Sequence, residues 1–301
     1  TGHPDIVRAQ TEALRCDGEF VIQSSVFLLD SHPARSLEKS LARWIGKEDG
    51  LICQSGYSAN LGLLQAIADP QTPVYLDTLA HTSLWEGARR AGAPSHPFRH
   101  NDPQHLERLV ARHGPGVVVV DSVYSTTGAV CPLESMVEVA ERAGCMILVD
   151  ESHSLGTHGL AGAGLCVALG LSHRVHFITA SLAKAFAGRA GFMTLPAEIR
   201  NYVLSTSYPN MFSSCLLPHE IAGLAATLTV IQRSDAARAN LRASTGHLRA
   251  ALSNRGLSRS SLSKRVRSRP PWSCVTAWKS VACSVLSSAR RQPVATGPWC
   301  A

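Results

Sequence analysis

The feature of this 301-residue chain that most constrains its fold is a repeated unit, in which a short apolar run ends in a polar residue and a helical pattern follows. The run VVVVD ends at Asp121 and the run MILVD ends at Asp150, with helical spacing over residues 133–143 between them. Runs this apolar are typical of strands buried on both faces of a parallel sheet. The repetition predicts an α/β fold with a mostly parallel central sheet flanked by helices.

The same pattern continues along the chain. Further strands are expected at residues 51–53, 74–77, 175–180 and 191–195. Helices are expected at residues 36–44, from residue 61, from residue 83, at 106–112, around 160–170 and at 218–232. Ser36 is a plausible N-cap for the first of these helices. The last is apolar nearly all round, which is typical of a helix buried in a core or a subunit interface.

Polar residues gather just after the expected strands, where open α/β sheets place their chemistry. The residues that share this position are Gly56, His81, Ser125, Asp150, His153, Ser181 and Lys184.

Three of these residues, each taken alone, also have a structural interpretation that involves no ligand. Gly56 at a helix start favours a phosphate site, but it also suits an ordinary tight turn. His81 could stack on an aromatic ring, but a lone loop histidine is usually solvated. Lys184 stands in an apolar run, where an ammonium needs a partner or a chemical use; the alternative is a lysine that reaches solvent.

Composition narrows the class of protein. The formal net charge of +7 belongs to the C-terminal part, because residues 233–301 hold 13 Lys and Arg against one acid, while residues 1–232 hold 16 against 21. The nine cysteines lack CxxC spacing, so neither a disulfide framework nor a metal site is expected. Without an apolar run of membrane length or a leader pattern, we expect a cytoplasmic protein.

Several motifs over residues 36–232 resemble the α-oxoamine synthases, a branch of the fold-type I pyridoxal phosphate enzymes. The motifs are SGYSAN, AHTSLWEGA, VDESHSLG and SLAKAF. Within this branch, the sequence most resembles the quorum-sensing autoinducer synthases, in the segments SLWEGAR, VHFITASLAKAF and SYPNMFSS.

The resemblance implies a role for each site residue. Lys184 would hold pyridoxal 5'-phosphate covalently and move the substrate's α-proton, while Asp150 would pair with the ring nitrogen. His81 would stack on the ring and His153 would hydrogen-bond its phenolic oxygen. Ser125 would lie near the substrate. The phosphate contacts would come from Gly56, Tyr57, Ser181 and, across a homodimer interface, Ser213 or Ser214.

The implied reaction is a decarboxylating condensation of an amino acid with an acyl-CoA, which gives an α-aminoketone. The subgroup implies a medium to long acyl chain, a small amino acid or S-adenosylmethionine as donor, and an α-hydroxyketone-type autoinducer as the end product. The alternatives are an 8-amino-7-oxononanoate synthase of biotin synthesis and an inactive remnant. No nucleic-acid or membrane partner is expected.

Three segments are predicted: an incomplete N-terminal segment at residues 1–35, a cofactor-binding domain at 36–232 and a C-terminal segment at 233–301. The likeness to the family ends near Gly256. Residues 257–301 lack Asp, Glu, Phe and Tyr but hold eight Lys and Arg. A basic nucleic-acid arm would account for this composition, but a shift of reading frame accounts for it better. Codons that encode WKSVACSVLSS, residues 278–288, can encode EERGVFGSVF when they are read in another frame.

Overall fold

The protein is described from a computed structural model that covers residues 2–16 and 23–254. The aberrant segment predicted from residue 257 lies outside the described residues. Close contacts divide the chain into two units, residues 1–240 and residues 241–301. No helix of the described part is long and apolar enough to cross a membrane.

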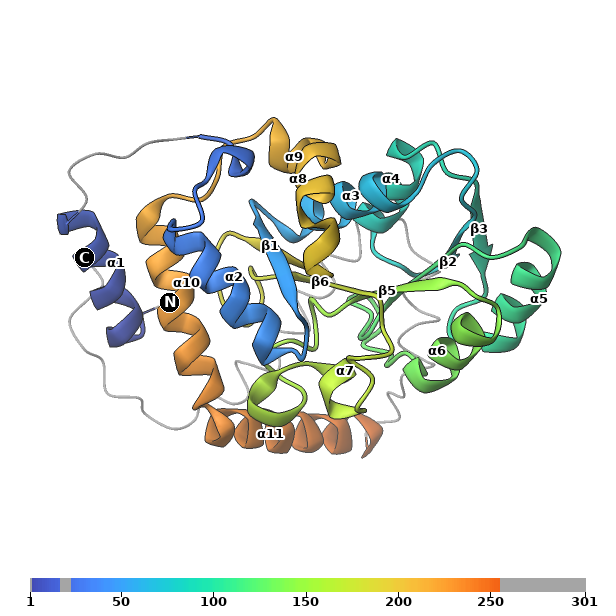
Figure 1. Cartoon of the computed structure of the whole chain (residues 1–301). Coiled ribbons are helices and arrows are strands. Elements are labelled where there is room, and N and C mark those ends of the chain that lie inside the picture. The colour runs from blue at the N-terminus through green and yellow to red at the C-terminus, as the bar shows by residue number, and fades with distance from the viewer. Residues whose placement is uncertain (1, 17–22, 255–301) are drawn as a thin grey trace, which may run out of the picture. The chain divides into compact units, whose positions relative to one another are not determined.

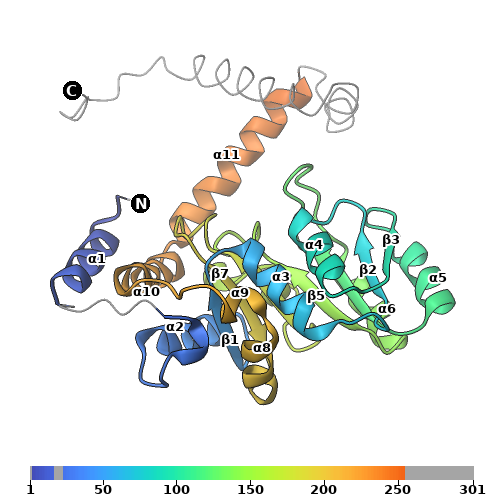
Figure 2. The same cartoon turned by 90° about the horizontal axis from the view of Figure 1, so that it is seen from above.

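Seven strands form one sheet in the first unit. They are β1 (Asp49–Cys53), β2 (Val74–Asp77), β3 (Ser95–Phe98), β4 (Val117–Asp121), β5 (Met146–Asp150), β6 (Phe177–Ser181) and β7 (Gly191–Leu195). Their order across the sheet is β1-β7-β6-β5-β4-β2-β3. Only β7 runs against its two neighbours, so the mostly parallel sheet expected from the sequence is confirmed. Figure 2 shows it spanning from β1 and β7 to β2 and β3.

Helices of the first unit surround this sheet. They are α1 (Pro4–Cys16), α2 (Pro33–Trp44), α3 (Gly56–Ile67), α4 (Thr82–Arg90), α5 (Pro103–His113), α6 (Leu133–Arg142), α7 (Leu165–Ala168), α8 (Arg200–Thr206), α9 (Tyr208–Met211) and α10 (Pro218–Gln232). Helix α11 (Asp235–Asn254) begins in the first unit and continues into the second. Short 3-10 turns cover Ser25–Phe27, Leu160–Gly162 and Ala197–Ile199.

Alternate residues along the strands pack into two separate apolar cores, one on each face of the sheet. One core joins the sheet to α3, α4 and α8, and the other joins it to α2, α5, α6 and α10. Figure 1 shows α3, α4 and α8 above the sheet and α6 and α7 below it. In β4, for example, Val117 and Val119 face the first core while Val118 and Val120 face the second. Burial on both sides explains why these strands are continuous apolar runs.

The structure corrects several expectations. The first thirty residues contain a helix, α1, which packs against α10. Helix α2 begins at Pro33 with His32 as its cap, not at Ser36, because proline suits the first helical position. The apolar stretch around residues 160–170 forms a 3-10 turn and the four-residue α7, since Gly159, Gly162 and Gly164 all have positive φ.

Candidate functional site

The carboxyl ends of four parallel strands place polar residues along one edge of the sheet. Strands β2, β4, β5 and β6 end at Asp77, Asp121, Asp150 and Ser181. The strand register pairs Asp121 with Asp150, so two carboxylate-bearing residues are neighbours at the centre of this edge. Helix α3 starts beside them, directly after β1.

Asp150 is a buried carboxylate held by two donors. Its side chain accepts the backbone N–H of Ser152 at Oδ1, over 2.8 Å, and the amide of Asn60 at Oδ2, over 2.7 Å. Only 3% of the residue is exposed. These bonds fix the plane of the carboxylate at the end of β5, where it can receive a positively charged or proton-bearing ligand atom.

Asp121 holds its proton more tightly than an ordinary aspartic acid. Burial, followed by the negative charge of Asp150, raises the pKa of Asp121 to about 8. Its Oδ2 accepts the backbone N–H of His81 over 3.0 Å, which ties the start of α4 to the end of β4. The site therefore holds two adjacent acids, one of which keeps its proton near neutral pH.

His81 and His153 approach from two different loops. His81 caps α4, and its Nδ1 lies 2.7 Å from the hydroxyl of Ser83, while the residue itself is exposed. His153 is half-buried in the turn after β5. Burial lowers the pKa of His153, and the charges of Lys184 and His81 lower it further, against the opposing effect of Asp150. These three side chains therefore lie within electrostatic reach of His153, whose imidazole is held neutral.

Lys184 lies in a tight loop after β6. The loop is closed by backbone bonds between Leu182 and Gly188 (3.0 Å) and between Ala190 and Leu182 (2.9 Å). Ala187 adopts a φ of 48°, an uncommon conformation for a residue other than glycine. The side chain of Lys184 is exposed and forms no ion pair with any residue that the structure describes. Its amine is therefore available to a ligand.

The start of α3 is packed closely against the end of β6. A Cβ atom on Gly56 would lie 2.5 Å from the Cβ of Ser181, and one on Gly191 would lie 2.1 Å from the carbonyl oxygen of Ser55. Glycine is required at both positions because no side chain fits. Ser55 caps the helix through Ser58, which leaves the N–H groups of Gly56 and Tyr57 without an acceptor inside the helix. Such a terminus favours an anion.

The three remaining predicted residues are more peripheral. Ser125 is exposed in the turn between Val123 and Val130. The Ser213 hydroxyl donates to the carbonyl of Pro209, while the Ser214 carbonyl accepts the side-chain amide of Gln54, just after β1. Within one chain the segment 213–214 thus adjoins the end of β1.

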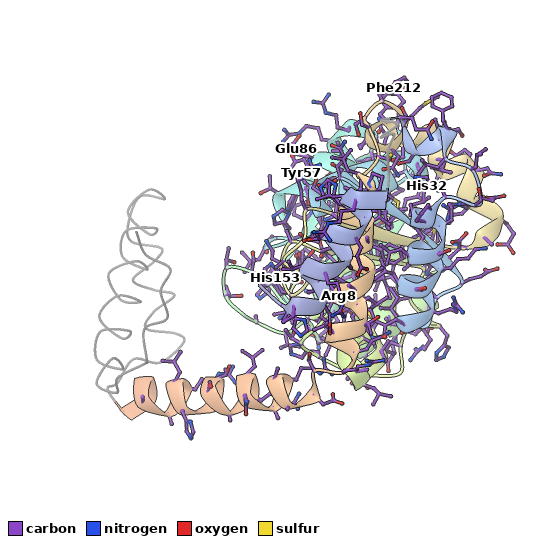
Figure 3. All side chains as sticks on the ribbon, turned by 90° about the vertical axis from the view of Figure 1, so that its left-hand side faces the viewer. Arg8, His32, Tyr57, Glu86, His153 and Phe212 are labelled. Atoms are coloured by element: carbon purple, nitrogen blue, oxygen red, sulfur yellow. The ribbon has the colours of Figure 1, made fainter. Side chains whose placement is uncertain are left out.

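Two aromatic side chains of the described residues, Tyr57 at the start of α3 and Phe212 just after α9, are exposed. Tyr57 is 46% exposed and Phe212 is 72% exposed. Figure 3 shows Phe212 at the outer surface, at the top of the view, and shows Tyr57 and His153 on the same side of the ribbon.

Sequence reasoning assigned no role to three polar residues of the site. Asn60, Ser83 and Ser152 are all buried and hydrogen-bonded, Asn60 and Ser152 to Asp150 and Ser83 to His81. A signal was present for Asn60, because it lies four residues after Gly56 on the same face of a helix that is otherwise apolar. Nothing comparable marked Ser83.

This combination of sheet, helix terminus and lysine loop is that of a known class. The chain belongs to the aminotransferase class I and II family, whose model matches residues 4–263. Its relatives place it in the α-oxoamine synthase branch, as its motifs suggested.

Individual relatives support that branch. The chain is 46% identical to the CAI-1 autoinducer synthase of Vibrio campbellii over 251 residues, which is 83% of this chain and 64% of that protein. It is 34% identical over 261 residues to a putative 8-amino-7-oxononanoate synthase 2 of Mycobacterium tuberculosis, covering 84% of this chain and 33% of that protein.

Solved structures agree. A serine palmitoyltransferase from S. paucimobilis, with a bound pyridoxal phosphate adduct, superposes with a TM-score of 0.80 at 28% identity, covering 84% of this chain and 65% of that one. The enzyme of Sphingomonas wittichii gives the same TM-score and identity, with 84% and 64% coverage. The chain thus spans about two thirds of the length of the Vibrio campbellii synthase and of both solved structures, and about one third of the Mycobacterium tuberculosis protein.

Proposed function

We propose that this chain is a pyridoxal phosphate-dependent acyltransferase of the α-oxoamine synthase type, which joins an amino acid to an acyl-CoA. The observation that carries the proposal is the grouping of Asp150, His153 and Lys184 at the carboxyl ends of neighbouring strands β5 and β6. This edge offers a fixed carboxylate, a neutral imidazole and an unpaired amine together.

The residues present fit pyridoxal 5'-phosphate. The start of α3 presents the N–H groups of Gly56 and Tyr57, which have no acceptor inside the helix and can bind a phosphate. Asp150 would bind the ring nitrogen, and the amine of Lys184 would bind the aldehyde carbon. When bound, the cofactor supplies an electron sink for negative charge at the α-carbon of an amino acid.

Around that cofactor, each side chain has a distinct task. Asp150 would keep the ring nitrogen protonated, and His81 would stack on the ring, which its exposed position permits. The neutral His153 would hydrogen-bond the phenolic oxygen. Lys184 would move the α-proton, a task that requires an unprotonated amine.

Less central contacts complete the proposed site. Ser181 would assist phosphate binding, together with Ser213 or Ser214 of a second subunit in a homodimer. Ser125 would lie near the substrate and the cofactor oxygen.

The proposed reaction balances without an added oxidant or reductant. The amino acid's α-carbon forms a bond to the acyl carbon, the thioester C–S bond breaks, and the CoA thiol leaves. The carboxyl group of the amino acid leaves as CO2, and an α-aminoketone results.

The chain is similar to the autoinducer synthase of Vibrio campbellii. Its aminoketone product would therefore be used to make an α-hydroxyketone-type autoinducer, and its acyl-CoA substrate would carry a medium to long acyl chain. The amino donor would be a small amino acid or S-adenosylmethionine. We retain residues 36–232 as the cofactor-binding domain and a cytoplasmic location as predictions.

A CoA-release assay with the purified protein and pyridoxal phosphate tests this function. We expect thiol release with 2-aminobutyrate and decanoyl-CoA, and none in the Lys184→Ala variant. Cofactor binding without release from any acyl-CoA would support the inactive remnant instead.

One alternative substrate pair deserves a direct comparison, because a relative at 34% identity is a putative 8-amino-7-oxononanoate synthase. Faster release with alanine and a pimeloyl thioester than with 2-aminobutyrate and decanoyl-CoA would favour that enzyme of biotin synthesis.

A further inference from the structure

A buried amide in α3 connects three elements of the site. Asn60 is 1% exposed, and its Nδ2 donates to Oδ2 of Asp150 on β5 over 2.7 Å and to the hydroxyl of Ser83 on α4 over 2.9 Å. Both amide hydrogens are therefore used. Its Oδ1 has no hydrogen-bond partner, so the orientation of the amide is set by these two acceptors.

The chain of bonds continues from Ser83 to His81. The Ser83 hydroxyl accepts from Asn60, so its own hydrogen is free to point at Nδ1 of His81, 2.7 Å away. The backbone N–H of Ser83 also donates to that Nδ1, over 3.3 Å. With Nδ1 accepting twice, the proton of the neutral imidazole lies on Nε2.

This relay of hydrogen bonds through Asn60 and Ser83 orients the side chains at its two ends, Asp150 and His81. On one side, Asn60 and the N–H of Ser152 fix the two oxygens of Asp150, one each. On the other side, Ser83 fixes the plane and the tautomer of His81. Asn60 touches neither the ligand space at His81 nor the amine of Lys184, so any effect it has on a ligand must pass through these partners.

We propose that Asn60 is a positioning residue that, directly and through Ser83, holds the Asp150 carboxylate and the His81 imidazole in one fixed arrangement for the cofactor. The inference rests on the proposed function, because it assumes that pyridoxal phosphate is the ligand of this edge. If Asn60 were buried only for packing, its replacement would weaken ligands with and without the ring nitrogen equally.

An analogue that lacks the ring nitrogen isolates this selectivity. Equilibrium binding is measured for pyridoxal phosphate and for deazapyridoxal phosphate, in which carbon replaces that nitrogen. In Asn60→Ala we expect pyridoxal phosphate to bind about tenfold more weakly, which equals about 1.4 kcal/mol. The analogue cannot pair with Asp150 and can lose only its contact with His81, so its affinity should fall by no more than it does in Ser83→Ala.

Two further variants separate the parts of the relay. Ser83→Ala leaves the Asn60–Asp150 bond intact and loosens His81 alone, so it should weaken both ligands by similar factors. Asn210→Ala is a matched control, because Asn210 is also a buried asparagine, at 3% exposure, and belongs to no part of the relay. It should lower the melting temperature without changing the ratio of the two affinities.

Each outcome is decisive. Equal losses of both ligands in Asn60→Ala, or no loss of either, would overturn the positioning role. Failure of the unaltered protein to bind pyridoxal phosphate would instead overturn the proposed function. If Asn60→Ala does not fold, Asn60→Leu keeps the side-chain volume without the donor, and the same ratio decides.

Discussion

At the scale of single residues, the site depends on the contrast between two neighbouring acids. Asp121 and Asp150 are register partners, yet only Asp150 accepts two well-placed N–H donors from its surroundings. Asp121 accepts one, from the backbone of His81. Two buried negative charges this close repel each other, so one of the pair retains its proton.

This contrast predicts a pH dependence of stability in the cofactor-free protein. Burial and the charge of Asp150 raise the pKa of Asp121 to about 8. The unfolded chain loses that proton near pH 4, so between about pH 4 and pH 8 the folded state binds the extra proton and the free energy of unfolding falls as pH rises. In Asp121→Asn, the fall from about pH 5 to pH 8 should be smaller by roughly 3 to 4 kcal/mol.

Denaturant titrations at the two pH values measure the effect. Asp30→Asn is the control, because the Asp30 side chain is 97% exposed and its loss should leave the pH dependence unchanged. Identical pH dependence in Asp121→Asn and the unaltered protein would contradict the account.

Sequence patterns predicted the site residues that follow strands but not the bonds between them. Asp150, His153 and Lys184 could be placed because apolar runs mark where strands end. The Asn60–Ser83 bond joins positions 23 residues apart on two helices, and no periodicity reports which helices face each other. The raised pKa of Asp121 likewise follows from its burial and from the nearby charge of Asp150 in three dimensions.

At the scale of elements, strands were easier to predict than helix starts. The bounds of β2, β4, β5 and β7 coincide with the apolar runs, since burial on both faces removes polar residues from them. Strand β3 was missed because it is an edge strand, largely exposed and interrupted by Pro97. Helix α1 was missed because its short stretch, residues 4–16, mixes charged and polar residues with few apolar ones.

One buried ion cluster ties three of these elements together. Arg200, at the start of α8, donates to Glu38 of α2 over 2.5 Å and to Asp49 of β1 over 2.9 Å. It is only 6% exposed, and its partners are 3% and 8% exposed. Removing one partner of a buried pair leaves the other charge desolvated and uncompensated.

Arg200→Ala should therefore lower the free energy of unfolding by about 3 to 5 kcal/mol. The matched control is Arg142→Ala, which breaks the exposed pair of Arg142 with Glu107 and should cost less than about 1 kcal/mol. Chemical denaturation of both variants gives the comparison. Similar costs for the two would show that the cluster does not tie α8 to the sheet.

At the scale of the whole molecule, the proposed cofactor contacts and the excess of basic residues belong to different parts of the sequence. Residues 1–232 are net acidic, and every proposed cofactor contact lies within them. The excess of basic residues falls after that point. The relatives are longer than this chain, which covers 64% of the Vibrio campbellii synthase. We therefore expect that cofactor binding can be measured separately from turnover.

The most direct test of the central claim is reductive trapping of the cofactor on this chain. The protein is treated with pyridoxal phosphate and borohydride, digested, and mapped by mass spectrometry. The account predicts a phosphopyridoxyl group on the peptide that carries Lys184, and its loss in Lys184→Ala, with Lys47 unmodified because its amine is engaged by the carbonyl of Val175. A folded protein that carries no adduct, or carries it on another lysine with Lys184 unmodified, would contradict the claim.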